Sequence, residues 1–117
     1  MKKKVLCFDL DNTICKTIGS DYDKSTPIIP VINLINRLHK KKHKIIIFTA
    51  RYMGRNKENS KIVYKKYYSK TYKQLQSWNL KFNKLIMGKP TYDMIIDDKS
   101  FNFKKNWVKS FEKKFLL

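Results

Sequence analysis

The apolar positions of this chain fall into short runs separated by polar stretches, which is typical of alternating strands and helices. Lys4–Leu10 is rich in strand-forming residues and ends on acidic ones, and Lys44–Phe48 predicts a second buried strand. Asn83–Met87 and Asp93–Ile96 are two shorter apolar runs that we also expect to be strands. Together the four runs predict one sheet.

Three segments have helical periodicity. Pro30 suits the first turn of a helix, and apolar residues then recur at helical spacing, at Val31, Leu34, Ile35 and Leu38. Asn56–Trp78 is a long helical stretch, and a closing helix has an apolar face made by Trp107, Phe111 and Phe115. The polar segment Ile14–Ile29 contains Gly19 and Pro27 and predicts a flap or loop.

One face of the long helical stretch is rich in aromatic residues. Its positions step by three or four residues, at Tyr64, Tyr68, Thr71, Leu75 and Trp78. Such a stripe could stack nucleic-acid bases. At this spacing it more often packs on a sheet, and core packing is the interpretation that we favour.

The predicted order is strand, helix, strand, helix, strand, strand, helix. This alternation favours an α/β fold: a three-layer, Rossmann-like arrangement with a mostly parallel central sheet and helices on both faces. The length of 117 residues predicts one domain over residues 1–117. No insertion is large enough for a cap domain, since Ile14–Ile29 and Tyr52–Ser60 could at most form flaps.

The composition fits a globular protein, with 42% hydrophobic residues and no apolar run long enough to span a membrane. The lysines at the N-terminus precede a strand-like run rather than a signal sequence, so we expect a cytoplasmic location. The two cysteines make no disulfide framework, and Cys7 is expected to be a small apolar residue in a buried strand.

The net charge of +18 has two interpretations. It favours an anionic partner, such as a phosphate ester, a nucleic acid or a membrane surface. Alternatively it reflects an A/T-rich genome, because only three of the 27 basic residues are arginines, namely Arg37, Arg51 and Arg55.

Candidate chemistry follows the predicted strands, and sites in parallel α/β sheets lie beyond the carboxyl ends of the strands. Asp9 and Asp11 leave the first strand together. One carboxylate can attack phosphorus, and the other can protonate the leaving group and then deprotonate water. The pair Asp97 and Asp98 follows the last predicted strand, and paired acids at a strand end suit Mg²⁺.

Two further strand ends carry groups that could hold phosphate. The hydroxyl of Thr49 can donate to a phosphate oxygen, and Arg51 could clamp a phosphate with two hydrogen bonds; a helix cap is the alternative for Thr49. Lys89, in a Gly-Lys-Pro sequence, could neutralise the attacking carboxylate and the transferred group. Gly-Lys-Pro is also an ordinary turn.

Four elements of this chain resemble the haloacid dehalogenase superfamily of phosphohydrolases. In chain order they are the pair Asp9 and Asp11, then Thr49 with Arg51, then Lys89, and last the pair Asp97 and Asp98. Phe-Asp-Leu-Asp-Asn-Thr is similar to its first motif, and Thr-Ala-Arg followed by Gly-Lys-Pro-Thr-Tyr-Asp-Met-Ile-Ile-Asp-Asp-Lys resembles small capless members linked to capsule or lipopolysaccharide synthesis. The resemblance implies Asp9 as nucleophile and Asp11 as general acid and base. It also implies Thr49 as a phosphoryl contact and Lys89 as the motif lysine.

The same resemblance implies Mg²⁺ as the cofactor. Its ligands would be the carboxylate of Asp9, the backbone carbonyl of Asp11 and the carboxylate of Asp97, with Asp98 binding directly or through water. Only seven residues separate Lys89 from Asp97, whereas a whole helix lies there in typical members, so Lys84 and Lys99 stay open as alternative site lysines. The candidate substrate contacts are Asn12, Thr13, Ala50, Arg51, Tyr52, Arg55 and Lys99. For Arg55 the alternative is a solvated position at the start of a helix.

We therefore expect a magnesium-dependent phosphomonoesterase that acts through an aspartyl-phosphate on a sugar phosphate or related metabolite. The pathway, surface-polysaccharide synthesis, comes from the resemblance alone. An open site would admit bulky substrates or be covered by a second copy of the chain. The alternatives are a nucleic-acid 3′-end phosphatase, which the charge would favour, and a non-catalytic basic binding protein.

Overall fold

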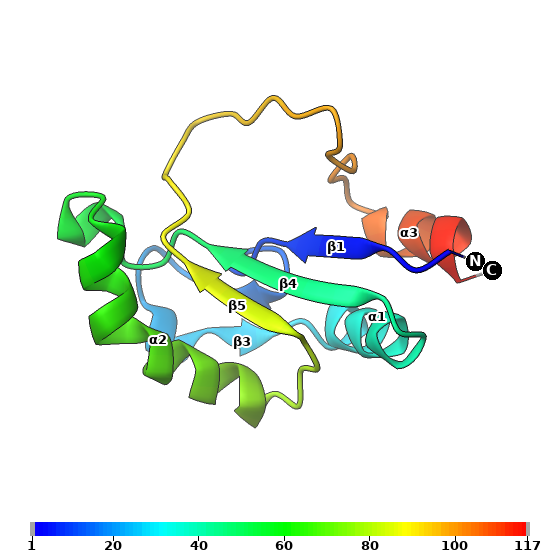
Figure 1. The fold of residues 1–117 in the computed structure, drawn as a ribbon, viewed down its shortest axis with the longest axis horizontal. Coiled ribbons are helices and arrows are strands. Elements are labelled where there is room, and N and C mark those ends of the chain that lie inside the picture. Colours follow the sequence, from blue (N-terminus) through cyan, green and yellow to red (C-terminus); the bar gives the residue numbers. More distant parts are fainter. Residues whose placement is uncertain (1, 117) are drawn as a thin grey trace.

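A parallel three-stranded sheet, in the order β1–β4–β5, forms the centre of the computed structural model, which describes residues 2–116 (Figure 1). Its strands are β1 (Val5–Phe8), β4 (Lys44–Thr49) and β5 (Lys84–Met87). Phe8 pairs with Ile47, and Thr49 pairs with Met87. The carboxyl ends of all three strands therefore meet at one edge of the sheet.

Three helices flank this sheet: α1 (Ile29–Lys40), α2 (Ser60–Ser77) and α3 (Trp107–Phe115). α1 contacts β4 and α3, and α2 contacts β5. The predicted α/β class, with a parallel sheet flanked by helices in a small Rossmann-like arrangement, is confirmed.

The two faces of the sheet are covered unequally. One face is buried in the hydrophobic core and carries Phe8, Ile45, Ile47, Leu85 and Met87. On the other face Ile46, Phe48 and Ile86 are only half-buried and Cys7 is exposed. The expectation of a buried Cys7 is wrong because β1 is an edge strand, and this cysteine lies on its less covered face.

Local chemistry sets where the helices begin. Pro30 lies in the first turn of α1, as predicted. α2 begins at Ser60, later than expected, because Lys57 and Glu58 have left-handed backbone angles that a helix cannot continue. Asn59 then caps the helix, its Oδ1 accepting from the N–H of Ile62 at 3.1 Å.

The aromatic stripe of α2 is buried in its second half. Thr71 and Leu75 are buried, whereas Tyr68 and Trp78 are half-buried and Tyr64 is exposed. Core packing is therefore confirmed for Thr71 and Leu75 and wrong for Tyr64, because in that turn of α2 the neighbouring Val63 faces the core and Tyr64 stacks on Tyr68 instead.

The segment predicted as a flap contains two very short strands, β2 (Cys15–Lys16) and β3 (Thr26–Pro27), which pair antiparallel. A 3₁₀ turn, η1 (Tyr22–Lys24), lies between them, and a second, η2 (Gly54–Asn56), precedes α2. We call residues 14–28 the flap. Neither the flap nor the segment from Tyr52 to Ser60 forms a cap domain.

The predicted strand Asp93–Ile96 is wrong. Residues 88–106, which we call the long loop, arch away from the sheet between β5 and α3 and contain no strand or helix (Figure 1). Among residues 2–116 the outer edge of β1 has no partner strand, and Val5 in β1 is 65% exposed. Ile96, in the apolar run of the long loop, is 89% exposed. A strand needs a neighbour for its backbone hydrogen bonds, and here this apolar run has none.

None of the helices described within residues 2–116 is long and apolar enough to cross a membrane.

Candidate functional site

Three groups of interest lie at the carboxyl edge of the sheet. Asp9 directly follows β1, Thr49 is the last residue of β4, and Lys89 follows β5 after Gly88. The backbone N–H of Lys89 donates to the carbonyl of Thr49 at 3.1 Å, which ties two of the strand ends together. Parallel pairing thus gathers side chains that are 40 residues apart in sequence at one edge.

The carboxylate of Asp9 faces Lys89. The Nζ of Lys89 lies 3.5 Å from Oδ1 of Asp9, and the hydroxyl of Thr13 donates to Oδ2 at 3.3 Å. The Asp9 side chain is 42% exposed, so an incoming group can reach it, whereas the Lys89 side chain is largely buried. The structure therefore brings Lys89, rather than the exposed Lys84 or Lys99, to this carboxylate.

The charge of Lys89 is secure at neutral pH. Burial by itself lowers the pKa of this ammonium, but the neighbouring Tyr92 and the Asp9 carboxylate outweigh it and raise the pKa above the ordinary value of 10.5. Its Nζ also lies over the rings of Phe48 and Tyr92. A fixed positive charge beside this partly exposed carboxylate can attract an anion to the edge of the sheet.

Asp11 points toward the flap and is held by Arg51. The Nε of Arg51 donates to both carboxylate oxygens of Asp11, at 2.9 and 3.0 Å, and the hydroxyl of Thr17 donates to Oδ1. The Arg51 side chain is 1% exposed and that of Asp11 20% exposed. A buried charge of this kind needs a paired partner, so this ion pair fixes both side chains.

The remaining donors of Arg51 are also engaged. NH1 donates to Oε1 of Gln74, and NH2 donates to Oγ of Ser25 at 3.2 Å and to Sγ of Cys15 at 3.7 Å. Arg51 was expected to clamp a phosphate, but in this structure it joins the flap, α2 and Asp11 to one another. Neither Gln74 nor Ser25 had a sequence signal, because Gln74 lies on a polar face of α2 and Ser25 lies in the polar flap.

Burial dominates the chemistry of Cys15, which lies in the same network. Burial raises the pKa of its thiol above the ordinary value of 9.0, although Thr17 and Arg51 act in the opposite direction. The thiol therefore stays protonated and donates to the carbonyl of Leu10 at 3.6 Å.

The other expected substrate contacts have diverse positions. The hydroxyl of Thr49 is buried and accepts from the N–H of Arg51 at 3.1 Å, and Ala50 lies between these two residues. Asn12 has a left-handed backbone, and its Oδ1 accepts from the N–H of Thr17. Arg55 donates to the carbonyl of Ser20 and lies over the rings of Tyr22 and Tyr52.

Asp97, Asp98 and Lys99 are exposed in the long loop, which arches away from the sheet (Figure 1). Oδ1 of Asp97 accepts from the N–H of Lys99 at 2.8 Å, as in an ordinary turn. Within residues 2–116 no group of three or more His, Cys, Asp or Glu side chains is placed to hold a metal ion. In this arrangement the residues do not fit the Mg²⁺ site that was expected.

Comparisons with known proteins concern the fold. No protein-family model and no curated protein matches this chain. A structural-genomics target from Vibrio cholerae has a similar structure, with a TM-score of 0.77, 24% identity, and coverage of 97% of this chain and 98% of that one. Two structures of a Pnkp1/Rnl/Hen1 complex, one described as an RNA repair complex, match with TM-scores of 0.54 and 0.55 at 17% and 15% identity. These matches cover 97% of this chain but only 32% and 34% of the matched chains, so this chain spans about a third of their length. At these identities the likeness shows that the chain shares the fold of these proteins.

Proposed function

We propose that this protein is a phosphomonoesterase in which Asp9 attacks phosphorus. The observation that carries the proposal is the pairing of the half-exposed Asp9 carboxylate with the largely buried Lys89 ammonium, 3.5 Å away at the carboxyl edge of the sheet. A carboxylate attacking a phosphate must overcome repulsion between two anions, and a fixed cation at this distance reduces it. The motif resemblance to haloacid dehalogenase phosphatases supports the same assignment.

The proposed reaction has two steps. In the first, an Asp9 oxygen bonds to phosphorus and the bond from phosphorus to the ester oxygen breaks, while protonated Asp11 gives its proton to that oxygen. In the second, water attacks the phosphorus of the aspartyl-phosphate, Asp11 accepts the proton of that water, and phosphate leaves. The ion pair with Arg51 holds Asp11 in the ionised form that the second step starts from, so for the first step this ion pair has to open and Asp11 has to take up a proton.

The edge of the sheet offers further groups for the transferred phosphoryl group. Thr49 carries a hydroxyl at the end of β4, and the chain turns immediately after it at Ala50. We propose that Thr49 and this turn contact the phosphoryl oxygens. Thr13 keeps the second oxygen of Asp9 in place, which leaves Oδ1, the oxygen nearer to Lys89, as the attacking atom.

Mg²⁺ is a separate part of the proposal. The acids expected to complete its site, Asp97 and Asp98, are in the long loop, and the open outer edge of β1 is the place at which residues 93–96 could pair as a strand. Such pairing would cover the exposed Val5 and Ile96 and bring the acids toward Asp9. The apolar character of this run in an exposed position is what supports this rearrangement.

The test is phosphate release from an aryl phosphate by the wild type and by Asp9→Asn. The amide keeps the size of the side chain but is not a nucleophile, so we expect turnover to fall by roughly 10³-fold or more. The matched control is Asp93→Asn, which changes an exposed acid of the long loop and should keep turnover within about twofold. Equal activity of wild type and Asp9→Asn would refute the mechanism.

The substrate that we propose is a sugar phosphate or a related metabolite. The proposed pathway, surface-polysaccharide synthesis, rests on the motif resemblance alone. A second candidate is phosphate removal from nucleic-acid 3′ ends. It is supported by the net charge of +18 and by the shared fold with chains of an RNA repair complex. The two substrates are separated by comparing phosphate release from hexose phosphates with release from 3′-phosphorylated oligonucleotides, at 50 and 200 mM salt. Only the second should weaken steeply with salt.

A further inference from the structure

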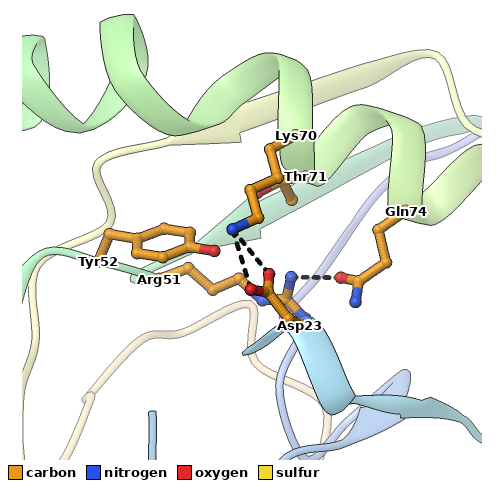
Figure 2. A pocket seen from close by; sticks show the side chains of 6 residues that line it. All are labelled: Asp23, Arg51, Tyr52, Lys70, Thr71 and Gln74. Carbon is orange, nitrogen blue, oxygen red and sulfur yellow. Dashed lines mark hydrogen bonds and ion pairs between the residues drawn. The ribbon is translucent and has the colours of Figure 1, made fainter. Parts of the chain in front are cut away.

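A cavity of about 190 Å³ lies between the flap and α2, and the proposed reaction gives it no role (Figure 2). Its walls come from η1, from α2 and from the turn that follows β4, and they are made by Asp23, Arg51, Tyr52, Lys70, Thr71 and Gln74. Arg51 lines the cavity and also holds Asp11. The cavity is therefore one side chain away from the proposed acid and base.

Thr71 gives the first indication of an occupant. It is 1% exposed, and its Oγ1 is buried with no hydrogen-bond partner among residues 2–116. Buried hydroxyls are nearly always hydrogen-bonded, so one left without a partner on the wall of a cavity points to a partner inside it.

The charges around the cavity are already paired. Arg51 is neutralised by Asp11, and Lys70 lies 2.8 Å from Asp23 at the rim. The amide of Gln74 is used on both sides, since its oxygen accepts from Arg51 and its nitrogen donates to the carbonyl of Tyr22. A phosphate or carboxylate would meet the negative charge of Asp23 and no free cation.

Hydroxyl groups face the cavity instead. Thr71 offers a group that both donates and accepts, and Tyr52 points its own hydroxyl toward Lys70 and Asp23 (Figure 2). Burial raises the pKa of Tyr52, so its hydroxyl remains a donor at neutral pH. Groups that both donate and accept are best matched by the hydroxyls of a ligand.

The size of the cavity limits the ligand. Its volume corresponds to about six water molecules and is below the roughly 300–1,000 Å³ of clefts for drug-sized ligands. The ring of Tyr52 stacks on Tyr67 at 3.7 Å and meets the edge of Tyr22 at 4.7 Å, so this wall is rigid. The rim is not rigid, because Lys70 and Asp23 are more than half exposed and such ion pairs are weak.

We propose that this cavity binds an uncharged polyhydroxyl group of the substrate, no larger than one sugar ring. The proposal rests on the proposed function for the word substrate, and on Thr71, Tyr52 and the paired charges for the chemistry of the ligand. A sugar hydroxyl bonded to Thr71 would lie beside Arg51, whose contact with Asp11 then relates the bound sugar to the proposed acid and base.

The direct test is an NMR titration of the wild type with glycerol, ribose and glucose, which needs no turnover. We expect saturable shifts of the amides of Tyr52 and Thr71 with at least one of them. Thr71→Val keeps the shape of the side chain but lacks the hydroxyl, and it should weaken this binding by about three- to tenfold. The matched control is Thr26→Val, an exposed threonine of the flap, which should bind as the wild type does. Absence of saturable binding, or equal binding by Thr71→Val, would overturn the proposal and leave a cavity that holds water.

Turnover separates this proposal from the function on which it rests. Thr71→Val should raise KM for a hexose phosphate by a similar factor, whereas Thr26→Val should leave both this KM and kcat/KM for an aryl phosphate unchanged. Sugar binding that depends on Thr71, without phosphate release from any ester, would uphold the cavity and refute the phosphatase. Release from the aryl phosphate with no sugar binding would do the reverse.

Discussion

At the scale of single residues, the contact between Lys89 and Asp9 distinguishes three lysines that the sequence left open. Lys84 begins β5 and is exposed, and Lys99 is exposed in the long loop. Lys89, just past the other end of β5, reaches Oδ1 of Asp9. The two ends of one strand therefore provide a comparison between a lysine at the proposed site and one away from it.

Lys89→Gln should lower turnover of an aryl phosphate by roughly 10²-fold or more, because it removes the charge that stabilises the transferred group. Lys84→Gln should stay within about twofold of the wild type, since it changes an exposed side chain at the opposite end of the strand. Steady-state phosphate release measures both. Similar losses in the two variants would mean that the net charge of the protein, rather than a positioned lysine, supports activity.

At the scale of elements, the junction between β5 and α2 depends on Gly88. Its φ is +90°, a backbone conformation that side chains disfavour, and a Cβ added there would lie 2.7 Å from Cβ of Ser60 in the first turn of α2. This close approach lets the chain leave β5 and place Lys89 beside Asp9.

Gly88→Ala should lower the free energy of unfolding by about 1–3 kcal/mol, through backbone strain and the clash with Ser60. Gly54→Ala is the matched control, because no atom lies within 4 Å of the added carbon and the change should stay within about 0.5 kcal/mol. Urea unfolding followed by circular dichroism measures both. A Gly88→Ala variant as stable as Gly54→Ala would contradict the packing of β5 on α2.

His43, which lies between α1 and β4, links the amino-terminal ends of β1 and β4. Its Nδ1 accepts from the N–H of Lys4 at 3.0 Å, and its ring packs edge-on against Phe115. Burial, and then the charges of Lys3, Lys4 and Lys41, lower its pKa below the ordinary value of 6.5. Between this lowered pKa and about pH 6.5, the folded state therefore holds a neutral imidazole that the unfolded chain would protonate.

The stability contributed by neutral His43 should be complete above about pH 6.5 and be lost as pH falls below that value toward the lowered pKa of the folded state. Below pH 6.5 the unfolded chain takes up a proton that the folded chain does not. The melting temperature of the wild type should therefore fall between pH 7 and pH 5. His43→Gln should reduce that slope, whereas His39→Gln should retain it, and an unchanged slope in His43→Gln would assign the pH dependence to other groups.

At the scale of the whole molecule, the structure has an open sheet edge and an exposed apolar run that lie on different parts of the chain. The outer edge of β1 exposes Val5, and the long loop exposes Met94, Ile95 and Ile96 ahead of Asp97. Exposed edges and apolar runs of this kind are normally covered in native proteins, by another segment or by another copy of the chain.

If residues 93–96 pair with β1 when Mg²⁺ binds, as proposed, Mg²⁺ together with phosphate should slow amide hydrogen exchange at residues 93–98 and along β1. Asp97→Asn should lose this protection, and Asp93→Asn should keep it. Protection of β1 alone, growing with protein concentration, would instead indicate coverage by a second copy. Mg²⁺-dependent turnover without any protection would contradict the rearrangement.

The sequence by itself determined the elements whose residues carry their own periodicity or turn chemistry. β4 and β5 have nearly their predicted bounds, and α1 and α3 form where the apolar spacing indicated helices, because apolar spacing, Pro30 and flanking polar residues are local properties. Parallel pairing of β1, β4 and β5 follows from their alternation with helices. That order was enough to predict that Asp9, Thr49 and Lys89 would share an edge.

Only the tertiary structure decided the partners of side chains that have no periodicity. Arg51 reads as a phosphate clamp in sequence, yet its partners Asp11, Gln74 and Ser25 come from three separate segments. Asp93–Ile96 has the composition of a strand but found no neighbour in this structure, because strand pairing depends on contacts that a local run does not contain. The cavity beside Thr71 likewise exists only where the flap meets α2.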